Sequence, residues 1–172
     1  MAKKRVSKHK KVLRQIGIVT LKVFIIFFFV SIISVLALKW IDPFTSSVMM
    51  QRKIFAFFSS DENSSIYYNW VNYDDISVNA KLAVIASEDQ NFPYHFGFDF
   101  EQLGKAINES QRGKRLRGAS TITQQVAKNL FLWNGKSLIR KGFEAYFTAL
   151  IESFWSKRRI LEVYLNIAEM GN

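Results

Sequence analysis

Glu88 is a candidate residue for acid–base chemistry. It follows an apolar run in the segment AVIASEDQNFPYHFGFD, residues 83–99. On a helix that ends near Asp89, Glu88 lies on the same side as Val84 and Ile85, so we expect its carboxylate to be partly desolvated. Desolvation disfavours the charged form of an acid, which is the tuning that a general base needs near neutral pH. The alternative is a solvated residue at a helix end.

A second candidate, Glu144, lies in the segment IRKGFEAYFTALIESFW. It follows Lys141 by three residues and Arg140 by four, so a local ion pair on a helix is the plain interpretation. Two carboxylates beside cationic side chains are also what glycosidic-bond chemistry uses. Glu88 and Glu144 are therefore a candidate pair for such a reaction.

The segment RGASTITQQVAKNLFLW, residues 117–133, predicts an anion-binding helix start. Thr121 and Gln124 fit a capping box, and the unpaired N–H groups of a helix N-terminus suit phosphate. One face of this helix is mostly polar, which fits the wall of a cleft that grips a sugar or pyrophosphate, although a plain solvent face is the alternative. The candidates on that face are Thr121, Gln125, Lys128 and Asn129.

Charge is distributed unevenly in this part of the chain. Residues 42–104 hold nine acids and three bases, whereas residues 105–141 hold nine bases and Glu109 as the single acid. Much of the positive charge lies in SQRGKRLRG, residues 110–118, which we interpret as a mobile loop that handles anions. A solvated surface loop is the alternative interpretation.

The N-terminal forty residues differ from the rest. They hold nine Lys and Arg and no acid, and the apolar run of residues 16–38 follows directly after a basic stretch. Its 23 residues span roughly 34 Å as a helix, which is enough to cross a hydrocarbon core of about 30 Å. We predict a basic cytoplasmic tail at 1–15, a transmembrane anchor at 16–38 and one domain outside the cytoplasm at 40–172. A cleaved signal peptide is the alternative.

Composition excludes several classes of site. The chain has no cysteine and two histidines, so disulfides and thiolate metal sites are ruled out and a metal would be held by oxygen atoms. The formal net charge of +10 invites a nucleic-acid partner. Most of that excess belongs to the N-terminal tail, however, so we predict no nucleic-acid binding.

The remainder of the sequence predicts a mainly α domain. Helices are expected at about 77–89, 99–111, 120–133, 136–155 and 157–168, with Asp99 as an N-cap. In the third of them, Ile122, Val126, Leu130 and Trp133 are expected to face the core. Residues 44–58 mix apolar and cationic side chains and either lie in a membrane interface or cap the core. Residues 59–75 are interpreted as loop or extended chain.

Four motifs occur in the order EDQNFPYHFGFD, RGASTITQQVAKN, RKGFE and KRRILEVYLN. In this respect residues 40–172 resemble the monofunctional biosynthetic peptidoglycan glycosyltransferases and the glycosyltransferase domain of bifunctional penicillin-binding proteins. The resemblance implies a lysozyme-like, mainly helical fold that polymerises lipid II at the outer face of the bacterial cytoplasmic membrane, and it favours the membrane anchor over the signal peptide.

The same resemblance implies roles for the candidate residues. Glu88 corresponds to the general base that deprotonates the 4-hydroxyl of the acceptor, so that undecaprenyl pyrophosphate leaves with inversion. Glu144 organises the pyrophosphate site, with a divalent cation such as Mg²⁺ or Mn²⁺ as a candidate cofactor. Lys136 stands where many members have arginine, which weakens the grip on phosphate. The residues expected to hold the pyrophosphate are Thr121, Gln125, Lys128, Asn129, Lys136, Arg140 and Lys141.

The resemblance also sets the alternatives. Relatives continue beyond the fourth motif, so we expect a C-terminally truncated domain whose partners are lipid II, the growing glycan chain, the membrane and proteins of cell division or wall synthesis. A lysozyme-like enzyme that cleaves glycan is one alternative. The other is an inactive truncated membrane protein that binds lipid II or wall-synthesis proteins without catalysis.

Overall fold

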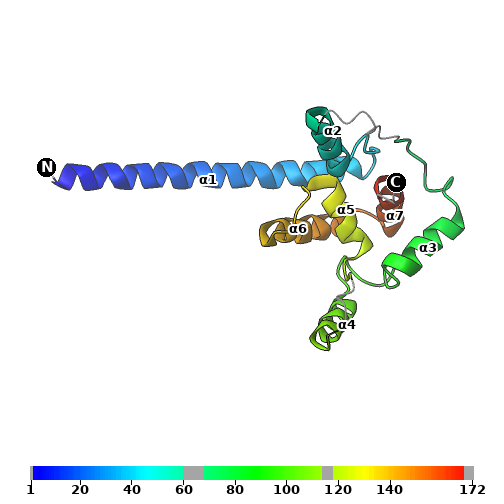
Figure 1. The fold of residues 1–172 in the computed structure, drawn as a ribbon. Helices are drawn as coiled ribbons and strands as arrows, with labels where there is room; N and C mark the ends of the chain where they lie inside the picture. Colours follow the sequence, from blue (N-terminus) through cyan, green and yellow to red (C-terminus); the bar gives the residue numbers. More distant parts are fainter. Residues whose placement is uncertain (1, 60–67, 114–117, 169–172) are drawn as a thin grey trace. The chain divides into compact units, whose positions relative to one another are not determined.

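The computed structural model describes residues 2–59, 68–113 and 118–168. These residues form seven helices, and no strand occurs among them (Figure 1). The mainly α fold predicted from the sequence is therefore confirmed. Residues 114–117 of the basic loop predicted at residues 110–118 lie outside the described residues. The chain divides into two compact units, residues 1–38 and residues 39–172.

The first unit is the single helix α1, Ala2–Leu38. Within it, Lys11–Leu38 contains an 18-residue window with a mean hydropathy of 2.8 and is long and apolar enough to cross a membrane. A signal sequence meets the same two criteria, so the helix is consistent with both interpretations of the N-terminus.

The second unit holds the six remaining helices, and α5 is at its centre. α5 packs against α6, α7 and α2. Ile122 and Val126 of α5, Ile151 of α6 and Ile160 of α7 are fully buried between these helices. Trp133 does not join them: it lies beyond the end of α5 and is exposed, so its predicted place in the core is wrong. The helices are α2 (Ser47–Ser59), α3 (Val78–Glu88), α4 (Phe100–Gln111), α5 (Ile122–Phe131), α6 (Leu138–Phe154) and α7 (Lys157–Ile167).

Side-chain caps fix where the central helices begin. The backbone N–H of Gln124 donates to Thr121 Oγ1 at 3.2 Å, and the Thr121 N–H donates to Gln124 Oε1 at 3.0 Å, which completes the predicted capping box of α5. Asp99 Oδ1 accepts from the Gln102 N–H at 2.8 Å at the start of α4, as predicted. Ser137 and Ser156 cap α6 and α7 in the same way. These bonds satisfy N–H groups that lack an intrahelical partner.

α2 docks on the end of α5 through polar contacts. Ser47 Oγ and Gln51 Nε2 donate to the Leu132 carbonyl at 2.7 and 3.1 Å, and the Asn134 N–H donates to Gln51 Oε1 at 2.8 Å. Most of the large apolar side chains of α2 stay exposed instead of capping the core. The interfacial alternative for this segment is therefore the better supported one. The exposed side chains are Met50, Ile54, Phe55, Phe57 and Phe58.

An extended segment ties the start of α3 to α7. The Asn166 side chain donates to the Val71 carbonyl and accepts from the Val71 N–H, at 2.9 and 2.8 Å. The Tyr73 N–H donates to Glu162 Oε1 at 2.7 Å, and Lys81 Nζ of α3 donates to the Tyr73 carbonyl at 2.7 Å. Because α7 belongs to the core, these bonds position α3, and with it Glu88 at the end of that helix.

The turn between α3 and α4 has room for glycine alone at position 97. Gly97 has a φ of +76°, and a Cβ atom there would lie 2.7 Å from Thr148 Cγ2 and 2.8 Å from Glu152 Cγ. Both neighbours are buried. Glu152 is held further by bonds from Thr123 Oγ1 and Lys157 Nζ at 2.6 and 2.8 Å. The turn is thus fastened tightly to α6.

We predict that Gly97→Ala destabilises the domain strongly. The left-handed backbone conformation costs about 1–2 kcal/mol for a residue with a Cβ, and overpacking in a filled interior adds roughly 1–3 kcal/mol. Gly113→Ala is the matched control, because Gly113 also has a φ of +76° but meets nothing within 4 Å. Urea unfolding followed by circular dichroism measures both; equal losses of stability would contradict the predicted clash.

Candidate functional site

Asp89 holds the turn after α3 against the start of α5. Its side chain is 3% exposed. Oδ2 accepts from the backbone N–H of Ile122 at 3.0 Å, and both carboxylate oxygens lie within 3.0 Å of His95 Nε2. A negative charge at a helix N-terminus is stabilised by the unpaired N–H groups and by the helix dipole. The second of the two adjacent acids therefore has a structural role.

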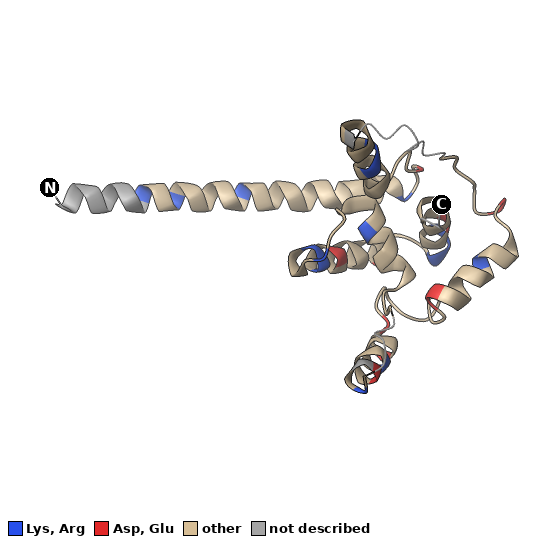
Figure 2. Cartoon of the chain, in the orientation of Figure 1, with Lys and Arg blue, Asp and Glu red and all other residues tan. Residues whose placement is uncertain are grey.

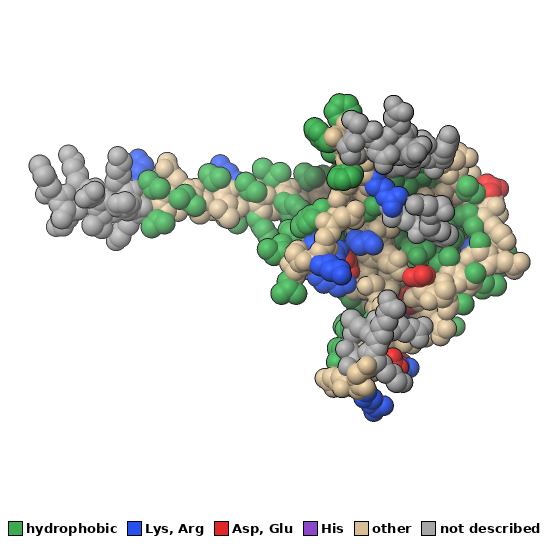
Figure 3. Space-filling view, in the orientation of Figure 1, with side chains coloured by type: hydrophobic (Ala, Val, Ile, Leu, Met, Phe, Trp, Pro, Cys, Tyr) green, Lys and Arg blue, Asp and Glu red, His purple; other side chains and the backbone are tan. Residues whose placement is uncertain are grey.

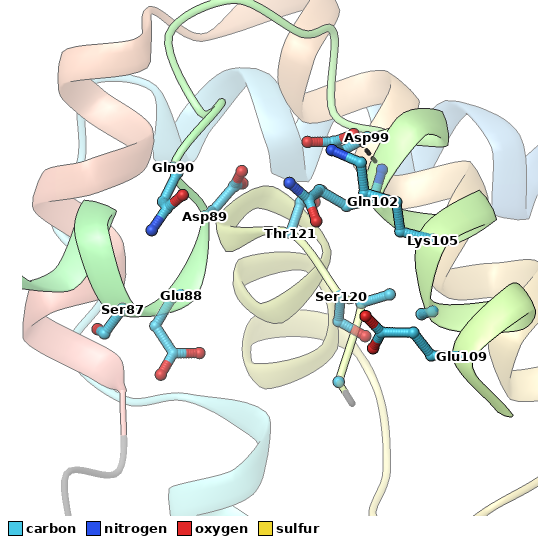
Figure 4. Close-up of a pocket in the computed structure, with 13 residues that line it drawn as sticks. Ser87, Glu88, Asp89, Gln90, Asp99, Gln102, Lys105, Glu109, Ser120 and Thr121 are labelled. Carbon is cyan, nitrogen blue, oxygen red and sulfur yellow. Dashed lines mark hydrogen bonds between the residues drawn. The ribbon is translucent and has the colours of Figure 1, made fainter. Parts of the chain in front are cut away.

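The side chain of Glu88, the last residue of α3, points away from that of Asp89 (Figure 4). The Glu88 side chain is exposed, so the solvated residue at a helix end, which spacing alone favours, is what the structure shows, and the partial desolvation that would suit a base is not found within this chain. The pattern failed because α3 ends at Glu88, and its apolar neighbours on that helix are themselves only partly covered. Gln125 Nε2 of α5 donates to Glu88 Oε2 at 2.9 Å. That bond ties the carboxylate to the central helix.

A cavity of about 280 Å³ opens beside Glu88. Its lining comes from the end of α3, from α4 and from residues 118–121 before α5. Figure 4 shows Glu88 on one side of this space and Lys105 and Glu109 of α4 on the other, with α5 behind them. A second cavity of about 410 Å³ shares residues 118–120 with the first and reaches Lys141 on α6. Glu88 lines the first cavity and Lys141 the second, and the segment before α5 borders both.

Asp99 lines both cavities and is ionised at neutral pH. Burial acts to raise the pKa of Asp99, but hydrogen bonds from the Gln102 N–H and from Asn91 Nδ2 outweigh that effect and hold the pKa below its usual value. Both of its oxygens are occupied by these bonds. Asp99 therefore shapes the site as the cap of α4.

Glu144 forms a compact ionic cluster with Arg140 and Lys141 at the start of α6. The Glu144 side chain is 3% exposed, Arg140 Nη1 donates to its Oε2 at 2.8 Å, and Lys141 Nζ donates to its Oε1. The predicted local ion pair is confirmed. Arg140 Nε is buried and has no hydrogen-bond partner among the described residues. The cluster thus keeps donor capacity for an anion.

The residues of the cluster do not fit a divalent cation at Glu144. Both carboxylate oxygens accept from cationic groups, which repel a metal ion and would have to be displaced by it. Among the described residues, ligand atoms of Asp89, His95 and Asp99 lie within 4.8 Å of one another. The carboxylates of that group already cap α5 and α4, so we derive no step through a metal.

The other predicted site residues lie either within α5 or in the segments directly before and after it. Lys128 and Asn129 follow Gln125 by three and four residues, so they lie on the same side of the helix; Lys128 is half-buried and Asn129 is buried. Lys136 is exposed in the connection to α6. The Thr121 hydroxyl accepts from Gln124 and donates to the Gly97 carbonyl at 2.7 Å. That hydroxyl serves the cap, and its predicted contact with pyrophosphate is not supported by this geometry.

Basic side chains gather on α5 and at the start of α6. Figure 2 shows Lys and Arg positions on both helices, and Figure 3 shows basic side chains grouped on the visible surface of that part of the domain. Arg140 and Lys141 are paired with Glu144, whereas the side chains of Lys128 and Lys136 make no hydrogen bond or ion pair among the described residues. The described arrangement suits binding of a polyanion such as pyrophosphate.

We predict that Asp89→Asn lowers the free energy of unfolding by about 1–3 kcal/mol, because the buried side chain loses its charge and one of the two acceptor oxygens that serve Ile122 and His95. Glu101→Gln is the control: it breaks an exposed pair with Lys105 at 2.6 Å, which is worth about 1 kcal/mol or less. Urea unfolding at pH 7 compares the two. Losses of equal size would show that Asp89 does not hold the turn.

Comparison with known proteins identifies the family of the chain. A family model described as Transglycosylase matches residues 53–172. Three biosynthetic peptidoglycan transglycosylases are similar to this chain. Those of Xanthomonas oryzae pv. oryzae, Pseudomonas entomophila and Xylella fastidiosa are 51%, 53% and 47% identical to this chain over 142, 141 and 142 residues. These matches cover 83%, 82% and 83% of this chain but only 58%, 59% and 58% of the relatives, so the chain spans less than two-thirds of their length. The chain belongs to the transglycosylase family.

Proposed function

We propose that the domain polymerises peptidoglycan glycan strands from lipid II. The observation that carries this proposal is the exposed Glu88 carboxylate, held by Gln125 at one cavity, with Lys141 of the Arg140–Lys141–Glu144 cluster at a second cavity that shares residues 118–120 with the first. A base at one end of a site and an anion-binding cluster at the other match a glycosyl transfer with a pyrophosphate leaving group. The names of the relatives point to the same reaction.

In the proposed reaction, Glu88 takes the proton of the 4-hydroxyl of the acceptor lipid II. The hydroxyl oxygen attacks the anomeric carbon of the growing chain as the bond from that carbon to the pyrophosphate oxygen breaks. A β-1,4 linkage forms with inversion, and undecaprenyl pyrophosphate leaves. General-base assistance of this kind contributes roughly 10²–10⁴-fold to a rate.

The leaving pyrophosphate gains negative charge as its bond breaks, and preorganised cations stabilise that charge. Arg140 and Lys141 are held in place by the buried Glu144 carboxylate. Glu144 is therefore a positioning residue in this mechanism. Lys128 and Asn129 on α5 and Lys136 before α6 are further candidates for contact with the phosphates.

We place the domain at the outer face of the bacterial cytoplasmic membrane. The helix Lys11–Leu38 is apolar enough to anchor it, and the basic residues before that stretch favour a cytoplasmic N-terminus. The exposed apolar side chains of α2 support contact with the lipid surface that supplies the substrate. Proteins of cell division or wall synthesis are proposed partners of the anchored enzyme.

A lysozyme-like enzyme that cleaves glycan is the second candidate function. The two candidate carboxylates favour it in principle, but Glu144 is buried and paired with two cations, which makes it unfit to serve as a second acid or a nucleophile. Cleavage of glycan also releases no pyrophosphate, so the cationic cluster has no place in it. An assay that offers both labelled lipid II and finished glycan distinguishes these functions. A polymerase lengthens lipid II into glycan, a lysozyme-like enzyme cleaves the finished glycan, and an inactive lipid II-binding protein does neither.

We predict that Glu88→Gln lowers glycan polymerisation by about 10²–10⁴-fold while lipid II binding changes little. The assay follows labelled lipid II in detergent as glycan ladders on a gel, with binding measured separately. Glu109→Gln is the comparison, because Glu109 lines the same cavity from α4; we expect a much smaller loss there. A Glu88→Gln enzyme with a rate near that of the wild type would refute the assignment of the base.

We further predict that Lys141→Ala lowers polymerisation turnover by about 10²-fold, which is the cost typical of a lost donor to a developing charge. Lys105→Ala removes a lysine that lines the cavity near Glu88 but pairs with Glu101, and we expect a much smaller effect. Turnover at saturating lipid II measures both variants. Equal losses would mean that charge in the cavity matters in general, without a distinct pyrophosphate site at α6.

A further inference from the structure

Tyr164 of α7 has no role in the proposed mechanism, yet its hydroxyl points at the site. The residue is 5% exposed, and its hydroxyl donates to Gln125 Oε1 in a long hydrogen bond of 3.4 Å. The other end of the same amide, Nε2, donates to Glu88 Oε2 at 2.9 Å. Tyr164, Gln125 and Glu88 thus form one hydrogen-bonded chain that runs from the core to the cavity. Long bonds of this kind are common in enzymes without substrate and tighten when it binds.

The chain of bonds has a direction that the Gln125 amide imposes. A glutamine amide has one oxygen that accepts and one NH₂ group that donates, and a carboxylate only accepts. With Nε2 toward Glu88, the oxygen faces Tyr164, whose hydroxyl can donate to it. The opposite orientation would place two acceptors, the amide oxygen and the carboxylate, against each other. The carboxylate therefore selects this orientation of the amide, and the Tyr164 hydroxyl, which can donate as well as accept, holds the amide in it by donating to the oxygen.

The phenol of Tyr164 keeps its proton near neutral pH. Burial, with a smaller contribution from the negative charge of Glu88, raises the pKa of Tyr164 to about 12. The protonated form is therefore the form present near neutral pH, and the hydroxyl stays a donor.

Tyr164 and Gln125 are held more firmly by the fold than Glu88 is. Tyr164 is one of the buried residues of α7, and Gln125 is next to the fully buried Val126 on α5. α5 and α7 pack directly against each other. Glu88, in contrast, is an exposed residue at the end of α3, so packing alone does not fix its rotamer. A site of this kind needs its reactive group to be held by side chains on rigid elements.

We propose that Tyr164 is a positioning residue that acts through Gln125 to aim the Glu88 carboxylate at the cavity. This inference rests on the proposed role of Glu88 as the base. It changes the role expected of Gln125, from a ligand of the pyrophosphate to the link between the core and the base. It also gives the fourth motif, KRRILEVYLN, a function besides helix packing.

The first test is Tyr164→Phe in the full chain, assayed with labelled lipid II. The ring still fills its place in the core while the donor is lost, so we expect turnover to fall by about 10–100-fold with an unchanged KM, as for a misplaced reactive group. Tyr68→Phe is the control: Tyr68 donates to the Pro43 carbonyl, remote from Gln125 in the bonding network. Its turnover should match the wild type. An unchanged turnover in Tyr164→Phe would overturn the proposal.

A double mutant separates positioning from simple destabilisation. In a Gln125→Ala background, Tyr164→Phe should cause no further loss of turnover, because the link through which it acts is already gone. Losses that multiply would show that Tyr164 acts by another route and would refute the proposal. Thermal unfolding of each variant shows whether the domain is folded at the assay temperature.

Nuclear magnetic resonance of the Gln125 side-chain amide provides a readout that does not depend on activity. In the wild type we expect slow hydrogen exchange of the NH₂ group, and faster exchange in Tyr164→Phe but not in Tyr68→Phe. Unchanged exchange in Tyr164→Phe would overturn the positioning role.

The two proposals can fail separately. If Glu88→Gln still polymerises lipid II, the assignment of Glu88 as the base is wrong. If Glu88→Gln is inactive and Tyr164→Phe matches the wild type, only the inference about Tyr164 is wrong.

Discussion

The site depends on the bond between the Asp89 carboxylate and the backbone N–H of Ile122. This contact joins the end of α3 to the start of α5 across 33 positions of sequence. With Asp89 fixed in the interior, its neighbour Glu88 is forced to the outside, within reach of Gln125 one turn into α5. One buried acid thus sets the place of the exposed acid beside it. The two adjacent carboxylates divide the structural and the chemical task between them.

A second buried network holds the turn from the other side. Lys157 Nζ donates to the His95 carbonyl at 2.7 Å and to Glu152 Oε1 at 2.8 Å, and Thr123 Oγ1 donates to the same carboxylate oxygen. Gly97 lies directly against Glu152. α5, α6 and α7 therefore all contribute to the turn that follows Glu88. Such polar networks in the interior are costly when one member is missing, so they specify a single arrangement when complete.

Local features of the fold could be predicted from the sequence, and nonlocal ones could not. The capping box of Thr121 and Gln124 and the Arg140–Glu144 pair are set by residues three or four apart, and both were predicted correctly. The contact of Asp89 with Ile122 has no such spacing, because it depends on how α3 and α5 pack. The desolvation expected for Glu88 was inferred from helix periodicity. Periodicity says which side of α3 Glu88 is on, but not that the helix ends there in the open.

The exposure of Glu88 changes where its activation has to come from. A carboxylate in contact with water is a weak base, and burial within the chain does not supply the missing desolvation here. In the proposed mechanism, substrate that fills the cavity between α3 and α4 would expel that water and surround the carboxylate with the acceptor sugar. On this proposal the base would stay solvated until the acceptor arrives, while Gln125 holds the direction of the carboxylate in advance. Orientation comes from the folded chain, and desolvation comes with the substrate.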